Sequence, residues 1–198
     1  LTGYFKAITK NWIYPSLTYF SIYELSLLPQ DNLIKNDFSF FRKNKISSIK
    51  LEQNAIIIVG QPFVELQIIS KETYEKIILQ ITRMHIGCNI YYAPHPIETQ
   101  FYNWLPQNIK ILKSQYPLEL VLISNSISEI IGFNSSVLFN STFLNICDKI
   151  FSILLDESYL LDSRLKGKNA EIYAHFKKVG VNVVTIDSYY KFSFLKEK

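Results

Sequence analysis

Cysteine is scarce in this chain of 198 residues, because only Cys88 and Cys147 occur and no CxxC spacing is present. This excludes a disulfide framework and a zinc site of the usual spacing, and it fits a reducing compartment. Charge is also sparse: charged residues make up 19% and the net charge is only +4, with the basic residues scattered along the chain. This argues against nucleic-acid binding.

Long apolar runs are missing as well. The run 55–59 is among the longest, far below the roughly 20 residues that span a bilayer, and no signal peptide is visible. The chain has no Walker A loop, no GxGxxG and no GxSxG nucleophile elbow. His85, His95 and His175 lack ligand spacing and no acidic cluster lies beside them, so we expect neither a metal nor a cofactor.

Apolar residues are plentiful, at 48% of the chain with 15% aromatic, which is enough for a sizeable core. We expect one large domain or one lobe of a larger protein. Residues 1–50 are rich in aromatics and turn residues and are interpreted as a linker or edge segment. Residues 51–198 are interpreted as the main domain, because the pattern of apolar runs changes at this point. Leu1 is not an initiator methionine, which favours one lobe of a larger protein.

Alternation of strand and helix patterns predicts an α/β fold with a parallel sheet. The run 55–59 is typical of a buried strand. Ser70 is typical of the N-cap of a helix, which we expect over 71–84, and the pattern of 88–92 predicts a second strand. Towards the C-terminus we expect a strand over 149–154, a helix over 170–178 that ends before Gly180, and a strand over 181–186. We expect a helix around 136–144, while 118–123 suits either a strand or a helix.

Ligands of parallel sheets bind at the carboxyl ends of the strands, so the loops after Val59 and Tyr92 are the first places to look for a site. The first loop is Gly60-Gln61-Pro62-Phe63-Val64-Glu65. Glu65 is its only carboxylate and is a candidate proton acceptor, although a solvated Glu65 in a plain turn is the simpler alternative.

In the second loop, His95 lies between Pro94 and Pro96, which restrict its backbone. An imidazole held at the mouth of a cleft suits a phosphate ligand or a proton donor, although a structural histidine is the simpler alternative.

Two further candidates follow along the chain. Ser135 and Ser136 begin an apolar helix pattern, where hydroxyls and free N–H groups favour phosphate, or where one serine is simply an N-cap. Glu119 is a carboxylate in an apolar run, and a ribose diol, a lysine or a backbone N–H group would be a suitable partner.

Both ends of the chain carry aromatic residues. Lys191, Lys196 and Lys198 lie among aromatics, which is typical of peripheral contact with a membrane or of a frayed tail. The aromatics between Trp12 and Tyr23 suit a docking surface for another lobe or a second subunit, such as a homodimer, or the domain's own core.

Taken in order, four segments and one expected helix resemble the family 52 glycosyltransferases, which are bacterial sialyltransferases of the lipooligosaccharide type: Gly60-Gln61-Pro62-Phe63, the helix that begins after Ser70, Tyr91-Tyr92-Ala93-Pro94-His95-Pro96-Ile97-Glu98, Pro117-Leu118-Glu119-Leu120 and Gly132-Phe133-Asn134-Ser135-Ser136. The resemblance covers about residues 55–144. It implies that residues 51–198 are a Rossmann-like nucleotide-sugar-binding domain, the C-terminal, donor-binding lobe of a GT-B fold. Because members of that family are longer, it also implies that the N-terminal lobe is missing from this chain. The acid-acid-Gly motif common in bacterial sialyltransferases is absent.

The resemblance further implies inverting, metal-independent transfer of sialic acid from CMP-sialic acid to a galactose-containing acceptor of a bacterial surface glycan. It implies a cytoplasmic enzyme, with peripheral contact at the inner face of the membrane. His95 would be the phosphate ligand and general acid and Glu65 the candidate base. The donor nucleotide would contact Gly60, Gln61, Pro96, Glu119, Ser135 and Ser136. Alternatives are another nucleotide-sugar donor, as in a glucosyltransferase, or a nucleotide-binding fragment without catalysis.

Overall fold

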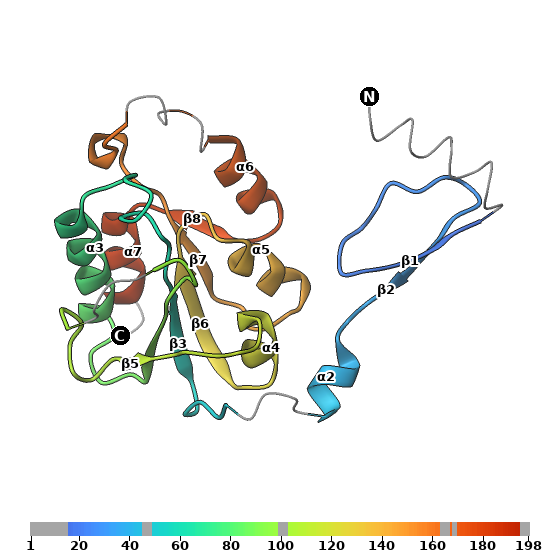
Figure 1. Cartoon of the computed structure of the whole chain (residues 1–198), viewed down its shortest axis with the longest axis horizontal. Helices are drawn as coiled ribbons and strands as arrows, with labels where there is room; N and C mark the ends of the chain where they lie inside the picture. The colour runs from blue at the N-terminus through green and yellow to red at the C-terminus, as the bar shows by residue number, and fades with distance from the viewer. Residues whose placement is uncertain (1–15, 45–48, 99–102, 163–166, 168–169, 195–198) are drawn as a thin grey trace.

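A six-stranded, all-parallel sheet forms the centre of the molecule, with the strand order β5-β4-β3-β6-β7-β8 (Figure 1). The computed structural model describes residues 16–44, 49–98, 103–162, 167 and 170–194. The strands are β3 (Ala55–Val59), β4 (Ile90–Ala93), β5 (Lys110–Ile111), β6 (Ile127–Gly132), β7 (Ile150–Ile153) and β8 (Asn182–Val184). Strands β4 and β5 follow β3 towards one edge of the sheet, whereas β7 and β8 follow β6 towards the opposite edge. The strand order therefore reverses between β3 and β6, which is where doubly wound sheets bind ligands.

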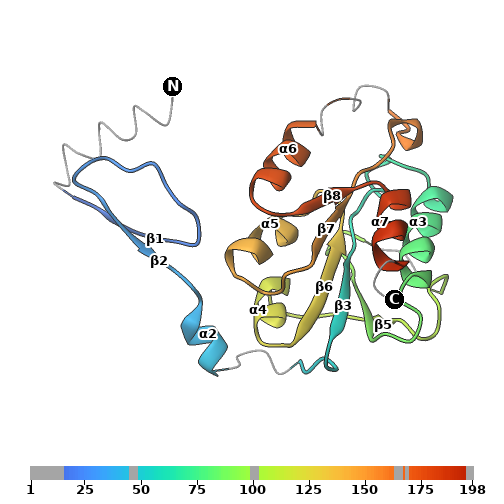
Figure 2. The ribbon, with the colours of Figure 1, turned by 180° about the vertical axis from the view of Figure 1, so that it is seen from behind.

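Helices cover both faces of this sheet, so that the fold has three layers (Figures 1 and 2). One face carries α3 (Lys71–Arg83) and α7 (Ile186–Phe194); the other carries α4 (Leu118–Ile123), α5 (Ser136–Phe143) and α6 (Ala170–Lys178), and a short 3-10 turn, η1 (Glu157–Tyr159), follows β7. Successive residues of a strand point to opposite faces. Ile56 and Ile58 therefore belong to the core under α3, and Ile57 belongs to the core under α4 and α5. The predicted α/β fold with a parallel, Rossmann-like sheet is confirmed.

Several expected elements form where the sequence placed them. The run 55–59 is β3 and is buried throughout, as expected for a strand covered on both faces. The Ser70 hydroxyl caps α3 by accepting a hydrogen bond from the Thr73 N–H. Gly180 ends the α6 segment with a φ of +95°, a left-handed conformation that glycine adopts without strain. The segment that suited either a strand or a helix is helix α4.

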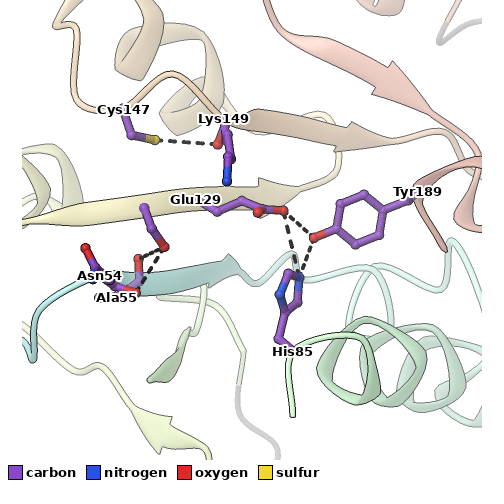
Figure 3. Close-up of polar contacts among 8 residues, drawn as sticks. Asn54, Ala55, His85, Glu129, Cys147, Lys149 and Tyr189 are labelled. Carbon is purple, nitrogen blue, oxygen red and sulfur yellow. Dashed lines mark hydrogen bonds and ion pairs between the residues drawn. The ribbon is translucent and has the colours of Figure 1, made fainter. Parts of the chain in front are cut away.

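The sequence did not predict β6, although this strand lies beside β3 in the middle of the sheet. Glu129 interrupts its apolar pattern, and that carboxylate is buried on the face under α7. The Tyr189 hydroxyl donates to Glu129, and His85 Nε2 lies 2.6 Å from the same hydroxyl (Figure 3). A buried carboxylate is tolerated because it is paired in this way.

The C-terminal segment differs from the frayed tail that its composition suggested, because residues 186–194 form helix α7. Tyr189 is 1% exposed and packs against Phe151, so that α7 belongs to the core. The strand expected over 181–186 is shorter for the same reason: β8 ends at Val184 and Ile186 begins α7. Lys196 and Lys198 lie outside the described residues. None of the helices in the described part of the chain has the length and apolar character needed to cross a membrane.

Residues 16–44 form a small unit beside α5, comprising β1 (Thr18–Ser21), β2 (Asn32–Lys35) and α2 (Ser39–Asn44). The two strands pair in parallel with each other, apart from the large sheet (Figure 2). Tyr23, in the loop between them, packs its ring on Phe139 and Phe143 of α5. Tyr23 is thus a contact within this chain, whereas Phe20 is 71% exposed. Trp12 lies outside the described residues.

Candidate functional site

A cavity of about 570 Å³ opens at the carboxyl edge of the sheet, at the switch point between β3 and β6. Its walls are the loops that follow β3, β4, β5 and β6. The volume lies within the range of about 300–1,000 Å³ that is usual for pockets that bind small ligands. It therefore has room for a nucleotide.

Nearly all of the residues that the sequence singled out line this one cavity: Gly60, Gln61, His95, Pro96, Glu119, Ser135 and Ser136. Glu65 is half-buried in the loop between β3 and α3 and is not part of the lining. Three further polar residues of the wall, Ser114, Tyr116 and Asn134, were not predicted. Ser114 and Tyr116 follow the two-residue strand β5, which is too short to leave a signal in the sequence.

The serine pair lies at the N-terminus of α5. The Ser135 hydroxyl accepts a hydrogen bond of 3.3 Å from the Val137 N–H, so this buried serine is the N-cap of the helix. Ser136 is exposed at the first helical position. Because the helix dipole and free N–H groups attract anions, this corner of the cavity suits a phosphate, with Ser135 holding the turn and Ser136 facing solvent.

His95 is fixed by its own loop. The Ile97 N–H lies 3.2 Å from the imidazole Nδ1 and donates to it. A ring that accepts at Nδ1 carries its proton at Nε2 when it is neutral. The ring therefore acts as a hydrogen-bond donor through Nε2.

A chain of hydrogen bonds ties this loop to the sheet. The Gln61 N–H donates to the Tyr74 hydroxyl over 2.9 Å, and the Tyr74 hydroxyl lies 2.9 Å from that of Tyr92. The Tyr92 hydroxyl donates to Glu98 over 2.7 Å, and the other oxygen of Glu98 accepts from the His95 N–H over 2.7 Å. Because the Tyr92 hydrogen points at the carboxylate, Tyr74 donates to Tyr92. The loops after β3 and β4 are thus joined through the protein interior.

Burial is the main reason that the pKa values of Tyr74 and Tyr92 are raised, and the negative charge of Glu98 raises both further. Both hydroxyls therefore keep their protons and remain donors. Gly60 sits against the same network, since a Cβ atom there would lie 2.3 Å from Glu98 Oε1 and 2.7 Å from the Tyr92 hydroxyl. The sequence drew attention to His95 but gave no sign of this support.

Glu119 lies in the first turn of α4, half-buried, with its side chain at the wall of the cavity. The Asn140 side-chain amide donates to Glu119 Oε1 over 2.8 Å. This partner is a neutral amide, so it orients the carboxylate without neutralising it. Within the described residues, neither a lysine nor a backbone N–H donates to the carboxylate. It is available to accept hydrogen bonds from sugar hydroxyls.

Within the described residues, no group of three or more His, Cys, Asp or Glu side chains is arranged to hold a metal ion. Cys147, the less exposed of the two cysteines, has its thiol pKa raised to about 11, mainly by burial. A thiol with such a pKa is a poor nucleophile at neutral pH.

The family model of the alpha-2,8-polysialyltransferases (POLYST) matches residues 12–154, which is more than half of the chain. No curated protein and no solved structure matches this chain. The expected sialyltransferase family is thereby confirmed, but the matching family is not family 52, so the assignment to that family and to lipooligosaccharide is unsupported. A sialyltransferase family implies a CMP-sialic acid donor and a glycan acceptor. This chain belongs to the alpha-2,8-polysialyltransferase family.

Proposed function

We propose that residues 51–198 are the donor-binding lobe of a GT-B polysialyltransferase, which transfers sialic acid from CMP-sialic acid to a sialylated glycan. The observation that carries the proposal is the single cavity at the strand-order switch, which gathers the serine pair, His95 and Glu119. These side chains can bind the phosphate and the ribose of a nucleotide donor, and membership of the polysialyltransferase family indicates that the transferred sugar is sialic acid.

In the proposed reaction, the bond between the anomeric carbon of sialic acid and the CMP phosphate breaks, and the electron pair stays on the phosphate. A hydroxyl of the acceptor attacks the opposite face of the sugar, with inversion, and gives its proton to a base. Ser136, the N-terminus of α5 and His95 would stabilise the developing phosphate charge. Removing one such donor typically lowers the rate by about 10²–10³.

His95 has two proposed roles that its loop distinguishes. As a hydrogen-bond donor to phosphate, it needs only the proton on Nε2. As a general acid, it needs protons on both nitrogens, and a protonated Nδ1 would no longer accept the hydrogen bond from the Ile97 N–H. The geometry supports hydrogen bonding to phosphate in the resting state, and proton donation requires that the contact with Ile97 opens.

The proposed base is Glu65. Glu65 is half-buried outside the cavity wall, so it would act only on an acceptor bound over the loop between β3 and α3. A base from another part of the protein would serve equally, and Glu65→Gln distinguishes the two because only the first arrangement loses transfer.

The test is transfer by the full-length protein that contains this lobe, from CMP-sialic acid to two labelled acceptors, one ending in sialic acid and one ending in galactose. We expect elongation of the sialylated acceptor, a fall of about 10²–10³ in kcat for His95→Ala, and little change for His175→Ala, a matched exposed histidine on α6 outside the cavity.

Other outcomes favour the alternatives. Transfer to the galactose-ending acceptor alone would favour the activity of the family 52 type. Preference for a UDP-sugar would favour another donor, as in a glucosyltransferase. CMP binding without transfer would favour a nucleotide-binding module, and no CMP binding would refute the proposal.

A further inference from the structure

The N-terminal unit reaches the donor cavity through a chain of side-chain contacts. The Tyr23 hydroxyl donates to Asn140 Oδ1, and Asn140 Nδ2 donates to Glu119 Oε1 over 2.8 Å. Tyr23 and Asn140 are 117 residues apart in the sequence, and the three residues come from the loop between β1 and β2, from α5 and from α4.

We propose that Asn140 and Tyr23 are positioning residues that hold Glu119 in the orientation that binds the ribose of the donor nucleotide. The inference rests on the proposed function. It adds the residues that determine selectivity for the ribose hydroxyls and assigns a role in the donor site to the unit 16–44.

The direction of the hydrogen bonds explains why two residues are needed. An amide presents either its oxygen or its nitrogen to a neighbour, and only the nitrogen is a donor. Glu119 only accepts, so it takes Asn140 Nδ2, and the amide oxygen is left to accept from the Tyr23 hydroxyl. The two hydrogen bonds hold the amide at both ends. Without Tyr23 the amide is held at the Glu119 end alone, and its position and that of the carboxylate are less restricted.

Packing holds Tyr23 in place for this role. Its ring lies 5.4 Å from Phe139 and 5.3 Å from Phe143, the latter in an edge-to-face arrangement. The pKa of Tyr23 is raised, first by burial and then by the negative charge of Glu119, so the hydroxyl keeps the hydrogen that it donates.

The part of the Glu119 carboxylate that Asn140 does not contact determines what the ligand gains from this arrangement. Oε1 is occupied by Asn140, while the carboxylate belongs to the cavity wall, so the remaining lone pairs accept from the two ribose hydroxyls. A side chain that is ordered before binding does not lose that conformational freedom when the ligand binds. Loss of the support should therefore weaken only ligands that carry the hydroxyls.

The experiment measures binding of CMP and of 2′,3′-dideoxy-CMP to the full-length chain by calorimetry. We expect the wild type to bind CMP about 10–100-fold more tightly, because hydrogen bonds to a carboxylate are lost in the dideoxy ligand. Asn140→Ala should weaken CMP about 3–10-fold and leave dideoxy-CMP unchanged, so that the preference contracts. Tyr23→Phe removes a single hydroxyl and should also reduce the preference for CMP over dideoxy-CMP. It provides the test in case Asn140→Ala does not fold.

Thr142→Ala is the matched control, since it also removes a side-chain hydrogen bond from α5 and Thr142 is not part of the cavity wall. It should leave the preference unchanged. An unchanged preference in both Asn140→Ala and Tyr23→Phe, or equal weakening of both ligands, overturns the positioning role while the proposed function stands. Failure of the wild type to bind CMP overturns both, and a wild type that binds both ligands equally overturns the role of Glu119 and hence of its supports.

Discussion

Replacement of Tyr92 by phenylalanine tests whether the buried hydrogen-bond chain supports the His95 loop. The ring is 0% exposed and stays in place, so the change removes only the hydroxyl that lies between Tyr74 and Glu98. One hydrogen bond to a carboxylate is lost, worth about 1.5–3 kcal/mol, and the Tyr74 hydroxyl loses its acceptor, at a cost of about 1–3 kcal/mol. We expect a total loss of roughly 3–5 kcal/mol in the free energy of unfolding.

The matched control is the same substitution one residue earlier, Tyr91→Phe. Tyr91 is also buried, and its hydroxyl accepts one hydrogen bond of 3.1 Å, from the Glu52 N–H. We expect a loss of only about 0.5–1.5 kcal/mol. For a chain of this length, 1 kcal/mol corresponds to about 2–4 °C in Tm, so the expected falls are roughly 6–20 °C for Tyr92→Phe and 1–6 °C for Tyr91→Phe.

Denaturant unfolding and calorimetry of the two variants give these values directly. In addition, CMP-sialic acid turnover should fall in Tyr92→Phe and not in Tyr91→Phe, because only the first variant releases Glu98 from the strand. If Tyr92→Phe costs no more stability than Tyr91→Phe, the hydrogen-bond chain is not a unit and the reasoning is wrong.

Three further predictions concern Gly60, His85 and the metal independence of donor binding. Gly60→Ala places a methyl group 2.3 Å from Glu98 Oε1, so we expect a loss of about 1–3 kcal/mol in denaturant unfolding and weaker CMP binding; an unperturbed variant would contradict the tight contact. Burial is the main cause that lowers the pKa of His85 in the folded protein. Near and below the ordinary value of about 6.5, the unfolded chain therefore binds more protons than the folded one. The wild type should lose stability as the pH falls through that value. His85→Gln keeps a donor for Tyr189 without titrating near neutral pH, and its stability profile should be flatter there; parallel profiles would show that His85 does not titrate differently on folding. CMP affinity should be the same with and without a chelator, and calorimetry that shows an obligatory metal would refute donor binding by the protein groups alone.

The sequence by itself determined the elements whose local signals agree with their surroundings. The run 55–59 has the apolar character of a strand buried on both faces, and Ser70 has the side chain that caps a helix, so both formed as predicted. The loop residues His95, Ser135 and Glu119 were also identifiable, because each follows a pattern that ends a strand or begins a helix and because parallel topology places such ends along one edge.

Only the tertiary structure decided the rest, because the signals lie in pairs of residues far apart in the sequence. Glu129 interrupts the apolar pattern of the central strand β6, and only the tertiary structure shows that Tyr189 and His85 pair this buried carboxylate. The buried Tyr189 also anchors α7 in the core, although the sequence of that segment resembles a tail. Glu98 supports His95 through Tyr92 and Tyr74, and Tyr23 reaches Glu119 through Asn140. Local pattern fixes which groups are present at the edge of the sheet, whereas packing across the whole chain fixes how those groups are oriented.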